Sequence, residues 1–284
     1  MPEKMRAIAG KLPGPEGRGN TASEPERLAR LAERAAARAG GYLLKVRRPE
    51  PSEWMTKGHH DFVTDVDRTA EKLIHADLLA AEPDSHILGE ELSPDDAVLT
   101  GLVWVVDPLD GTTNFLHGYP WWSVSIAAVI DGEVVAGTVF HVPAHRRYTA
   151  WRGGGAWCGP DRLQVSTVTD PGQALIGTGF PFKTPQDLPA YHGQLDQILP
   201  TTAGVRRAGS AAIDLATVAA GQFDGFWELT LAPWDKAAGI ILIREAGGVV
   251  TDLEGAPARA AHGGIVAGNP TMHSWLMKQV GGTG

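Results

Sequence analysis

The sequence predicts a fold of the α/β (α+β) class, in which helices pack on an antiparallel sheet and a smaller α/β part follows. The antiparallel sheet is indicated by two apolar, strand-like runs, residues 122–130 and 133–142, on either side of Asp131-Gly132. Asp-Gly between two such runs is a strong signal for a two-residue β-hairpin turn. The α/β part is indicated beyond about Ser166, where short strand-like runs alternate with helical patterns.

Composition and pattern divide the chain into three segments. Residues 1–23 carry charges, proline and glycine but no apolar core of a signal peptide, so we expect a flexible leader. Residues 24–165 are expected to form the helices and the antiparallel sheet, and residues 166–284 the α/β part. With 284 residues, of which 43% are hydrophobic, the chain can bury the core of one large domain or of two modest ones.

Two amphipathic helices are predicted ahead of the sheet. The first is indicated by apolar residues at helical spacing: Leu28, Leu31, Ala35, Ala39, Tyr42 and Val46. Prolines, a glycine and histidines interrupt the pattern over residues 49–60. The second helix is predicted to begin after Thr64, a suitable N-cap, and to end near Ala81.

The remaining elements follow in chain order. A strand over residues 102–106 precedes the hairpin, and the turn Gly153-Gly154-Gly155 separates two further short strand-like pieces. In the second part, strand-like runs at residues 174–177, 204–207, 223–227 and 264–267 precede helical patterns at about 186–199, 210–220, 234–245 and 271–280. Such alternation is typical of an α/β layer.

Charge and cysteine content limit the partners of the protein. The formal net charge is −8, and Lys and Arg form only short clusters, so we do not expect a nucleic-acid-binding protein. Cys158 is the single cysteine, which excludes an intrachain disulfide, and no apolar run approaches the roughly 20 residues that span a bilayer. We therefore expect a cytoplasmic protein with no membrane partner. An acidic protein that binds an anionic substrate usually needs a cation between the two.

The most informative stretch is residues 104–114, Trp-Val-Val-Asp-Pro-Leu-Asp-Gly-Thr-Thr-Asn. An apolar strand is expected to end by projecting Asp107, and a second carboxylate, Asp110, follows three residues later. Two carboxylates this close repel each other unless a cation lies between them, and hard oxygen ligands favour Mg²⁺. Gly111 and Thr112 then open a turn whose backbone N–H groups can bind a phosphate oxygen.

Each acid in this region also has a purely structural interpretation. Asp-Gly alone is usually a surface turn, and Asp235, at the start of a predicted helix, has the position of a helix cap. Asp65 and Asp67 both lie in the first turn of a predicted helix, where any acid favours the helix dipole, and periodicity does not choose between them. Glu90 and Glu91 end a strand-like run. Taken together, however, these acids indicate a cluster of metal-binding carboxylates.

At these residues the chain resembles a known family, the inositol monophosphatases and their lithium-sensitive phosphatase relatives. The resemblance covers about residues 28–282. The motifs that carry it are Asp61-Phe-Val-Thr-Asp-Val-Asp67, Gly89-Glu90-Glu91, residues 104–115, Gly177-Thr-Gly-Phe180, Gly209-Ser210-Ala211-Ala212, Trp234-Asp235-Lys-Ala-Ala-Gly239 and Glu245-Ala-Gly-Gly248. The resemblance implies a layered αβαβα sandwich, with metals where its two parts meet, and a homodimer.

The resemblance also implies a role for each matching residue. Two or three Mg²⁺ ions would be bound by Glu90, Asp107, the carbonyl of Leu109, Asp110 and Asp235, with Asp107 shared between two ions. Asp67, Glu90 and Thr112 would be catalytic, and the register of the motif favours Asp67 over Asp65. The substrate would contact Asp110, Gly111, Thr112, Gly209, Ser210, Ala211, Glu228 and Asp235. Glu228, expected at the end of a strand, would accept a hydroxyl of the sugar ring.

The function that the resemblance implies is Mg²⁺-dependent, lithium-sensitive hydrolysis of inositol 1-phosphate or a similar small polyol phosphate by metal-activated water. Within the same chemistry, fructose 1,6-bisphosphate, histidinol phosphate and nucleotide 3′-phosphates are alternative substrates. A regulatory protein that keeps the fold and binds a macromolecule is the non-enzymatic alternative. The complete set of acids argues against it, because a scaffold without catalysis need not retain a costly cluster of charges.

Overall fold

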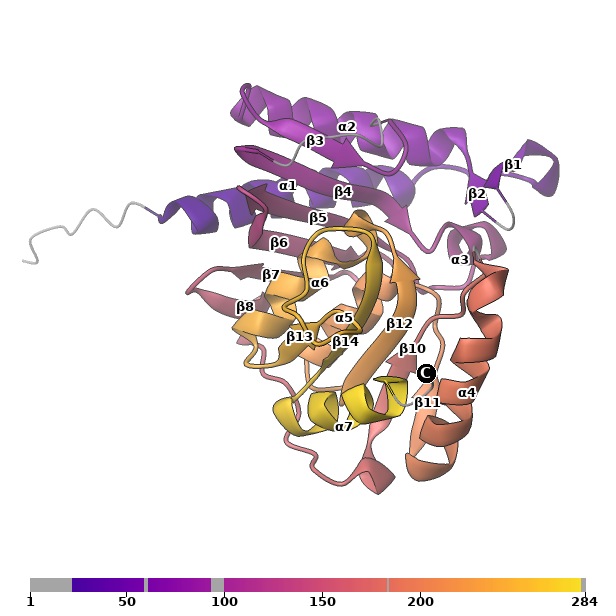
Figure 1. Ribbon diagram of the computed structural model, residues 1–284. Coiled ribbons are helices and arrows are strands. Elements are labelled where there is room, and N and C mark those ends of the chain that lie inside the picture. Colours follow the sequence, from indigo (N-terminus) through magenta and orange to yellow (C-terminus); the bar gives the residue numbers. More distant parts are fainter. Residues whose placement is uncertain (1–21, 59–60, 93–99, 183, 282–284) are drawn as a thin grey trace, which may run out of the picture.

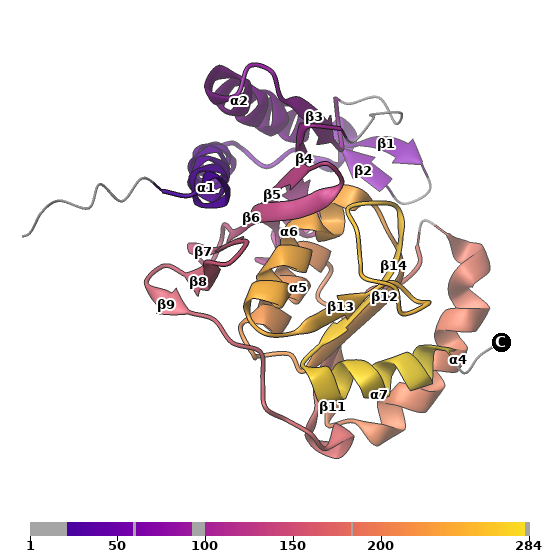
Figure 2. The ribbon, with the colours of Figure 1, turned by 60° about the vertical axis from the view of Figure 1, so that its left-hand side comes forward.

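Five layers of secondary structure, in the order αβαβα, form the protein in a computed structural model that describes residues 22–58, 61–92, 100–182 and 184–281 (Figures 1 and 2). The expected layered sandwich is therefore confirmed. The helical layers are α1 (Glu24–Leu43) with α2 (Asp65–Ala81), α5 (Ala211–Ala219) with α6 (Pro233–Glu245), and α4 (Leu188–Ile198) with α7 (Pro270–Gly281). The predicted leader, residues 1–23, lies almost entirely outside the described residues.

The first helical layer begins at two well-formed caps. Ser23 is the N-cap of α1, where its hydroxyl accepts the backbone N–H of Glu26 at 3.4 Å. Thr64 caps α2, as predicted: its hydroxyl accepts the N–H of Val66, and the carboxylate of Asp67 accepts the N–H of Thr64 in return. This reciprocal capping box fixes the start of α2. It also turns the Asp67 carboxylate back toward the chain that enters the helix.

The seven-stranded sheet has the order β3-β4-β5-β6-β7-β8-β9 and separates the first two helical layers (Figure 2). Its strands are β3 (His86–Gly89), β4 (Leu102–Asp110), β5 (Ser123–Ile130), β6 (Glu133–His141), β7 (Arg146–Trp151), β8 (Gly155–Cys158) and β9 (Asp161–Arg162). Every neighbouring pair is antiparallel, as predicted, except β3 and β4, which are parallel. The sequence could not reveal this exception, because a four-residue apolar run has the same pattern in either orientation.

The predicted hairpin is formed by β5 and β6. Asp131 and Gly132 connect the strands with φ angles of +50° and +82°. Two successive positive φ angles define the turn that matches the twist of paired strands, and Asp-Gly favours it. A second hairpin, β1 (Met55–Gly58) with β2 (Asp61–Val63), occupies the segment that the sequence marked only as a break between helices.

The five-stranded sheet has the order β11-β10-β12-β14-β13. Its strands are β10 (Leu175–Thr178), β11 (Gly204–Arg206), β12 (Gly225–Leu231), β13 (Val249–Thr251) and β14 (Gly263–Gly268). β10 is parallel to β11 and β12, whereas β14 is antiparallel to β12 and β13. The last strand of the seven-stranded sheet ends at Arg162, and the strands of the second sheet follow it in the chain. Helix α6 packs on both sheets and so connects the two parts. The division into domains at residue 165 stays a prediction.

Three apolar clusters fill the spaces between the layers. One lies between the first helices and the seven-stranded sheet, the second surrounds α5 and α6, and the third lies beneath α4 and α7. Trp104 of β4 is fully buried in the first cluster, and Trp227 of β12 in the third. Among the described residues, no helix combines the length and the apolar character that crossing a membrane requires.

Candidate active site

Asp107 and Asp110 face the same space because β4 contains a bulge. The strand continues past its predicted end and includes both acids. Asp107 pairs with Ser125 and Asp110 with Ser123, so β4 advances three residues while β5 advances two. Residues three apart in a regular strand point to opposite faces. The additional residue, next to Pro108, therefore brings the two carboxylates to one side.

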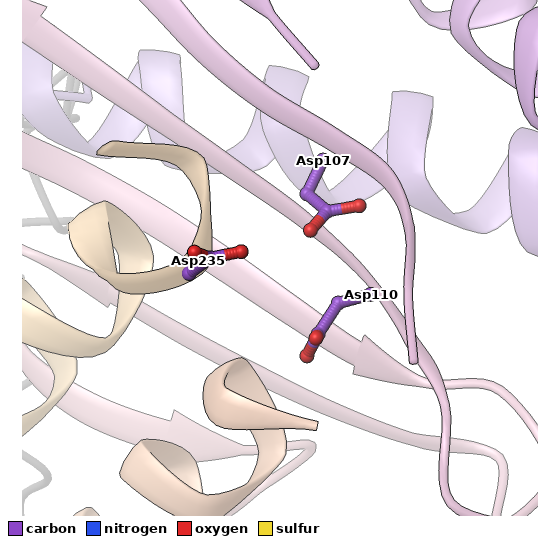
Figure 3. Close-up of side chains that lie close together, drawn as sticks. All are labelled: Asp107, Asp110 and Asp235. Atoms are coloured by element: carbon purple, nitrogen blue, oxygen red, sulfur yellow. The ribbon is translucent and has the colours of Figure 1, made fainter. Parts of the chain in front are cut away.

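Asp235 completes a cluster of three carboxylates. It lies in the first turn of α6, where its Oδ2 accepts the backbone N–H of Ala232 at 2.7 Å. One oxygen atom from each of Asp107, Asp110 and Asp235 lies within 4.8 Å of the other two. Figure 3 shows the three side chains facing a common space between β4 and the start of α6. The cluster thus joins the seven-stranded sheet to the central helices.

Asp110 is fixed by the N-terminus of α5. Its Oδ2 accepts the hydroxyl of Ser210, the backbone N–H of Ala212 at 3.0 Å and the hydroxyl of Ser123 at 3.3 Å. Backbone N–H groups in the first turn of a helix have no helical acceptor, so a carboxylate there is stabilised. No residue in the described ranges donates a hydrogen bond to Oδ1 of Asp110. That oxygen is available to a further ligand.

The electrostatics of the cluster favour a bound cation. Burial, and then the charges of Glu90, Asp110 and Asp235, raise the pKa of Asp107 well above its ordinary value. Burial also raises the pKa of Asp110 to about 6, although the hydrogen bonds from Ser210 and Ala212 oppose the shift. Ionised acids are therefore costly here without a positive charge among them. A divalent cation would offset both the burial and the mutual repulsion.

Asp67 reaches the site through Thr112. The Thr112 hydroxyl, in the first turn of α3 (Thr112–His117), lies 3.1 Å from Oδ1 of Asp67 and 2.9 Å from the carbonyl oxygen of Leu109. The single hydroxyl proton can be donated to only one of them at a time. Asp67 is 1% exposed, and burial raises its pKa. Asp65, by contrast, is exposed, so the structure separates the two acids that periodicity left equivalent.

Glu90 and Leu109 border the same space. Glu90 follows β3 and lines the cavity with Asp107, although it is outside the three-carboxylate cluster that the described residues form. Its charge is the largest single contribution from a neighbouring group to the raised pKa of Asp107. The backbone N–H of Leu109 donates to Oδ1 of Asp107 at 3.0 Å, which holds the chain between the two aspartates in a tight turn.

Two glycines bring the loops of the site together. Gly111 has a φ angle of +87°, and a Cβ at this position would lie 2.9 Å from the carbonyl oxygen of Trp121. Gly209 has a φ angle of +92°. Between them, the side-chain amide of Asn114 donates to the carbonyl oxygens of Trp121 at 2.7 Å, Ala208 at 3.0 Å and Gly209 at 3.3 Å. These contacts place the loop before α5 against the start of α3.

One cavity of about 670 Å³ collects nearly all the predicted site residues. The predicted residues that line it are Glu90, Asp107, Leu109, Asp110, Gly111, Thr112, Gly209, Ser210, Ala211, Glu228 and Asp235. Asp67 is the exception and contacts the cavity through Thr112. Residues that are distant in the sequence, from both sheets and from α5 and α6, therefore meet at one concave site.

Glu228 was expected at the end of a strand, but in the structure it lies within β12. The predicted strand ended with the apolar run at Trp227, whereas β12 continues through Glu228 to Leu231. The end of an apolar run therefore did not mark the end of the strand. Burial, and then the charges of Asp235 and Asp214, raise the pKa of Glu228 well above its ordinary value. Its carboxylate occupies the space that a side chain at Gly179 would need.

No role was assigned from the sequence to several other residues that line the cavity. The guanidinium of Arg207 lies 5.2 Å from the ring centroid of Phe180 and 4.7 Å from that of Phe182, and all three residues line the cavity. Asp214 is 2% exposed and accepts the indole N–H of Trp121 at 3.3 Å. Phe180 lies in one of the motifs that resemble the family, and Asp214 lies shortly after another. A motif does not show which residues its members contact in the folded protein.

The donor set of the cavity fits Mg²⁺. Asp107, Asp110, Asp235 and Glu90 line the cavity with carboxylate side chains, and Leu109, which has a backbone carbonyl oxygen as a further candidate ligand, also lines it. Mg²⁺ prefers oxygen ligands, usually one or two carboxylates together with water and substrate phosphate. Among the residues that the structure describes, this cluster contains neither a cysteine nor a histidine. The arrangement can bind a divalent cation and present it to a phosphate ester.

Comparison with known proteins gives a consistent result. A family model described as the inositol monophosphatase family matches residues 24–282. The inositol-1-monophosphatase of Rhizobium meliloti is 47% identical over 213 residues, which cover 75% of this chain and 80% of the relative. Nus factor SuhB of Escherichia coli is 43% identical over 241 residues, which cover 84% of this chain and 90% of the relative.

A solved structure has the same fold. The extragenic suppressor protein suhB of Bartonella henselae superposes with a TM-score of 0.81 at 38% sequence identity. The match covers 89% of this chain and 98% of that protein. The similarity therefore extends over both sheets and the central helices, including the elements that carry the acidic cluster.

Proposed function

Because this chain belongs to the inositol monophosphatase family, we propose that it is a Mg²⁺-dependent phosphomonoesterase that hydrolyses inositol 1-phosphate or a similar small polyol phosphate. The observation that supports the proposal most is the cluster of Asp107, Asp110 and Asp235 on the wall of the cavity. Asp107 and Asp110 are buried and have raised pKa values, a combination that is typical of functional sites when it occurs at the wall of a concave cavity. The oxygen-only donor set favours Mg²⁺ over softer metals.

Two or three Mg²⁺ ions are proposed. Glu90, Asp107 and the carbonyl oxygen of Leu109 would hold one ion, and Asp107, Asp110 and Asp235 would hold a second. When bound, Mg²⁺ lowers the pKa of a coordinated water and stabilises charge on the oxygen that leaves phosphorus. The hydrogen bonds from Ser210 and Ala212 keep Oδ2 of Asp110 in place, so its other oxygen has a fixed direction.

Asp67 and Thr112 are proposed to orient the attacking water. The Thr112 hydroxyl and the Asp67 carboxylate are within hydrogen-bond distance of each other, so a water between them and the cluster would be held in one direction. Asp67 can accept a proton from that water as it attacks phosphorus. Its raised pKa makes it a better proton acceptor than an exposed aspartate.

The remaining lining residues are proposed to bind the substrate. Backbone N–H groups of Gly111 and Thr112 would contact the phosphate. Gly209, Ser210 and Ala211 would lie along the ring, and Glu228 would accept a ring hydroxyl from β12. Every one of these residues lines the cavity.

Three further properties stay predictions. Lithium sensitivity follows from the family, since Li⁺ is close to Mg²⁺ in size but carries half its charge. A homodimer is also expected from the family alone. A cytoplasmic location is proposed because the single cysteine, Cys158, cannot form an intrachain disulfide.

A role with a macromolecular partner is the second candidate, because several relatives carry the name Nus factor SuhB, which is not the name of an enzyme. The two functions are compatible, since a partner can bind the outer surface while the cavity acts on a small molecule. The buried acids favour catalysis as the role of the cavity. Burying like charges is destabilising unless an opposite charge offsets their repulsion, so such clusters are typical of sites that bind a cation or catalyse a reaction.

A panel of phosphate esters tests the proposed substrate. The panel contains inositol 1-phosphate, fructose 1,6-bisphosphate, histidinol phosphate and a nucleotide 3′-phosphate, each assayed with Mg²⁺. We expect the highest kcat/KM for inositol 1-phosphate. A higher value for another ester would reassign the substrate within the same chemistry, and turnover of none would favour the non-enzymatic role.

A further inference from the structure

The buried carboxylate of Glu71 has no part in the function proposed above. Glu71 is 0% exposed and follows Asp67 by four residues on α2. Side chains four apart on a helix share one face. The same face of α2 therefore carries Asp67 toward Thr112 and, one turn further, Glu71 toward the end of β3.

Glu71 accepts hydrogen bonds from the segment that follows Glu90. Its Oε2 accepts the backbone N–H of Glu91 at 2.8 Å, and its Oε1 accepts the N–H of Leu92 at 3.3 Å. Nε2 of His75, one turn further along α2, lies 3.1 Å from Oε1. A buried carboxylate is tolerated when donors surround it, and here two of the donors are backbone groups of a single loop.

Gly89 leaves the space that the Glu71 carboxylate occupies. A Cβ at Gly89 would overlap Oε1 of Glu71, so only glycine leaves room for the carboxylate at the end of β3. The absence of a side chain at residue 89 and the buried acid at residue 71 are complementary. This fit places the carboxylate directly beside the backbone that leads into Glu90.

The backbone of Glu90 is thereby held on both sides. Its N–H donates to the carbonyl oxygen of Val106 at 3.2 Å, and Gly89 pairs with Val106 in the parallel pair of β3 and β4. The residue after Val106 is Asp107. On the other side, the N–H of Glu91 is held by Glu71. The path of the chain around Glu90 is thus fixed relative to Asp107 by one strand and one buried carboxylate.

We propose that Glu71 is a positioning residue that holds Glu90 beside Asp107 for binding of a divalent cation. The inference rests on the proposed function, in that Glu90 and Asp107 are taken as metal ligands. A purely structural role, anchoring α2 to the sheet, would affect only the stability of the fold. A positioning role would change metal affinity in a protein that still folds.

The test is a calorimetric titration of the metal-free protein with Mg²⁺, without substrate, for the wild type and Glu71→Gln. Glutamine keeps the shape, but its NH₂ group must face a backbone N–H in either orientation, because both oxygens of Glu71 accept one. Loss of a residue that orients a metal ligand commonly costs about 10- to 100-fold in metal affinity. We expect a rise of that size in the Kd for Mg²⁺, with kcat recovering at high Mg²⁺.

Asp77→Asn is the matched control. Asp77 lies on the same helix, but its carboxylate pairs with Arg38 of α1 and not with the loop that follows β3. We expect this variant to bind Mg²⁺ within twofold of the wild type and to change little in thermal stability, because an exposed ion pair contributes at most about 1 kcal/mol. If folded Glu71→Gln also binds within twofold of the wild type, the inference is overturned.

If Glu71→Gln does not fold, the same titration is made with His75→Ala. His75 is half-buried, so its removal is better tolerated than that of Glu71, and it removes one polar contact from Oε1 of Glu71. We expect a smaller rise in the Kd, of about two- to fivefold, and an unchanged value would overturn the inference. A wild-type protein that binds no Mg²⁺ would overturn the proposed function, and this inference with it. Wild-type binding with unchanged variants would overturn this inference alone.

Discussion

The hydroxyl of Thr112 lies 3.1 Å from Oδ1 of Asp67, although 45 residues separate them in the chain. This contact joins the first turn of α2 to the first turn of α3. It also connects an N-terminal capping box, which by itself has only a structural purpose, to the cavity that contains the acidic cluster. Asp67 therefore caps a helix and also contacts the site through Thr112.

The first prediction compares two aspartates of the same helical turn. Asp67→Asn should lower kcat by about 10²- to 10⁴-fold, the range for loss of a positioned proton acceptor. Asp65→Asn should retain near wild-type activity, because Asp65 is exposed. The measurement is kcat at saturating Mg²⁺, with the melting temperature of each variant recorded to show that α2 still forms. Equal activity of the two variants would remove Asp67 from the reaction.

The second prediction concerns the cluster itself. Asp110→Asn and Asp235→Asn should each lower kcat by about 10²- to 10³-fold, because each removes charge from the proposed second metal site. Asp224→Asn is the matched control: Asp224 is buried like Asp110, but it accepts the N–H of Leu175 and lies outside the cavity. It should lose stability rather than catalysis. More than a tenth of wild-type activity in either cluster variant would contradict the two-ion assignment.

The third prediction is a pH dependence of the effect of Mg²⁺ on stability. Burial raises the pKa of Asp110 to about 6 in the folded protein, above its ordinary value of 3.8. Between these two values the folded state binds more protons than the unfolded state, so the metal-free protein loses stability as the pH rises from about 4 through about 6. Mg²⁺ binds the ionised form. The rise in Tm on adding Mg²⁺ should therefore be larger at pH 7.5 than at pH 5.

The expected size of this effect follows from linkage. At a concentration 100 times its Kd, a ligand stabilises the folded state by about 2.7 kcal/mol. For a chain of this length that corresponds to a rise in Tm of roughly 5–11 °C at pH 7.5. The control is NaCl at the same ionic strength. The same rise at both pH values would mean that the buried acids do not bind the ion.

The fourth prediction separates recognition from chemistry. Glu228→Gln should lower kcat/KM for inositol 1-phosphate more than for glycerol 2-phosphate, which lacks the ring hydroxyls. A hydrogen bond to a charged acceptor contributes about 1.5–3 kcal/mol, or roughly 10- to 150-fold. Bound Mg²⁺ would favour the charged form of Glu228, because the charges of Asp235 and Asp110 are among the causes of its raised pKa. An equal loss on both esters would make Glu228 structural or metal-linked.

Most of the fold was accessible from the sequence because its signals are local. Asp131-Gly132 gives the hairpin, and Thr64 gives the start of α2. The alternation after residue 165 gives the helices of the second part and every strand of the second sheet except β13. The parallel pairing of β3 with β4 was not accessible, since strand orientation depends on the path of a connection and not on the apolar run. The hairpin of β1 and β2 was missed because its strands are too short for a periodic pattern.

The site was accessible only through motifs, and motifs do not give contacts. The sequence shows Asp107 and Asp110 three residues apart, but the bulge that turns both to one side becomes visible only in the pairing with β5. Glu71 carries a signal that was not used: it is an acid on the buried face of an amphipathic helix, four residues after Asp67. The contact that gives Glu71 its role is with the backbone of Glu91, 20 residues later in the chain, and the sequence does not show that contact.

The most direct test of the account is phosphate release from inositol 1-phosphate by the purified wild-type protein, measured first in excess chelator and then after Mg²⁺ is restored. We expect release with Mg²⁺ to fall by at least about 10²-fold in chelator, in line with the loss of a major electrostatic stabiliser, and to return when Mg²⁺ is added back. Release at the same rate in chelator, or no release from this ester when Mg²⁺ is saturating and bound, would contradict it.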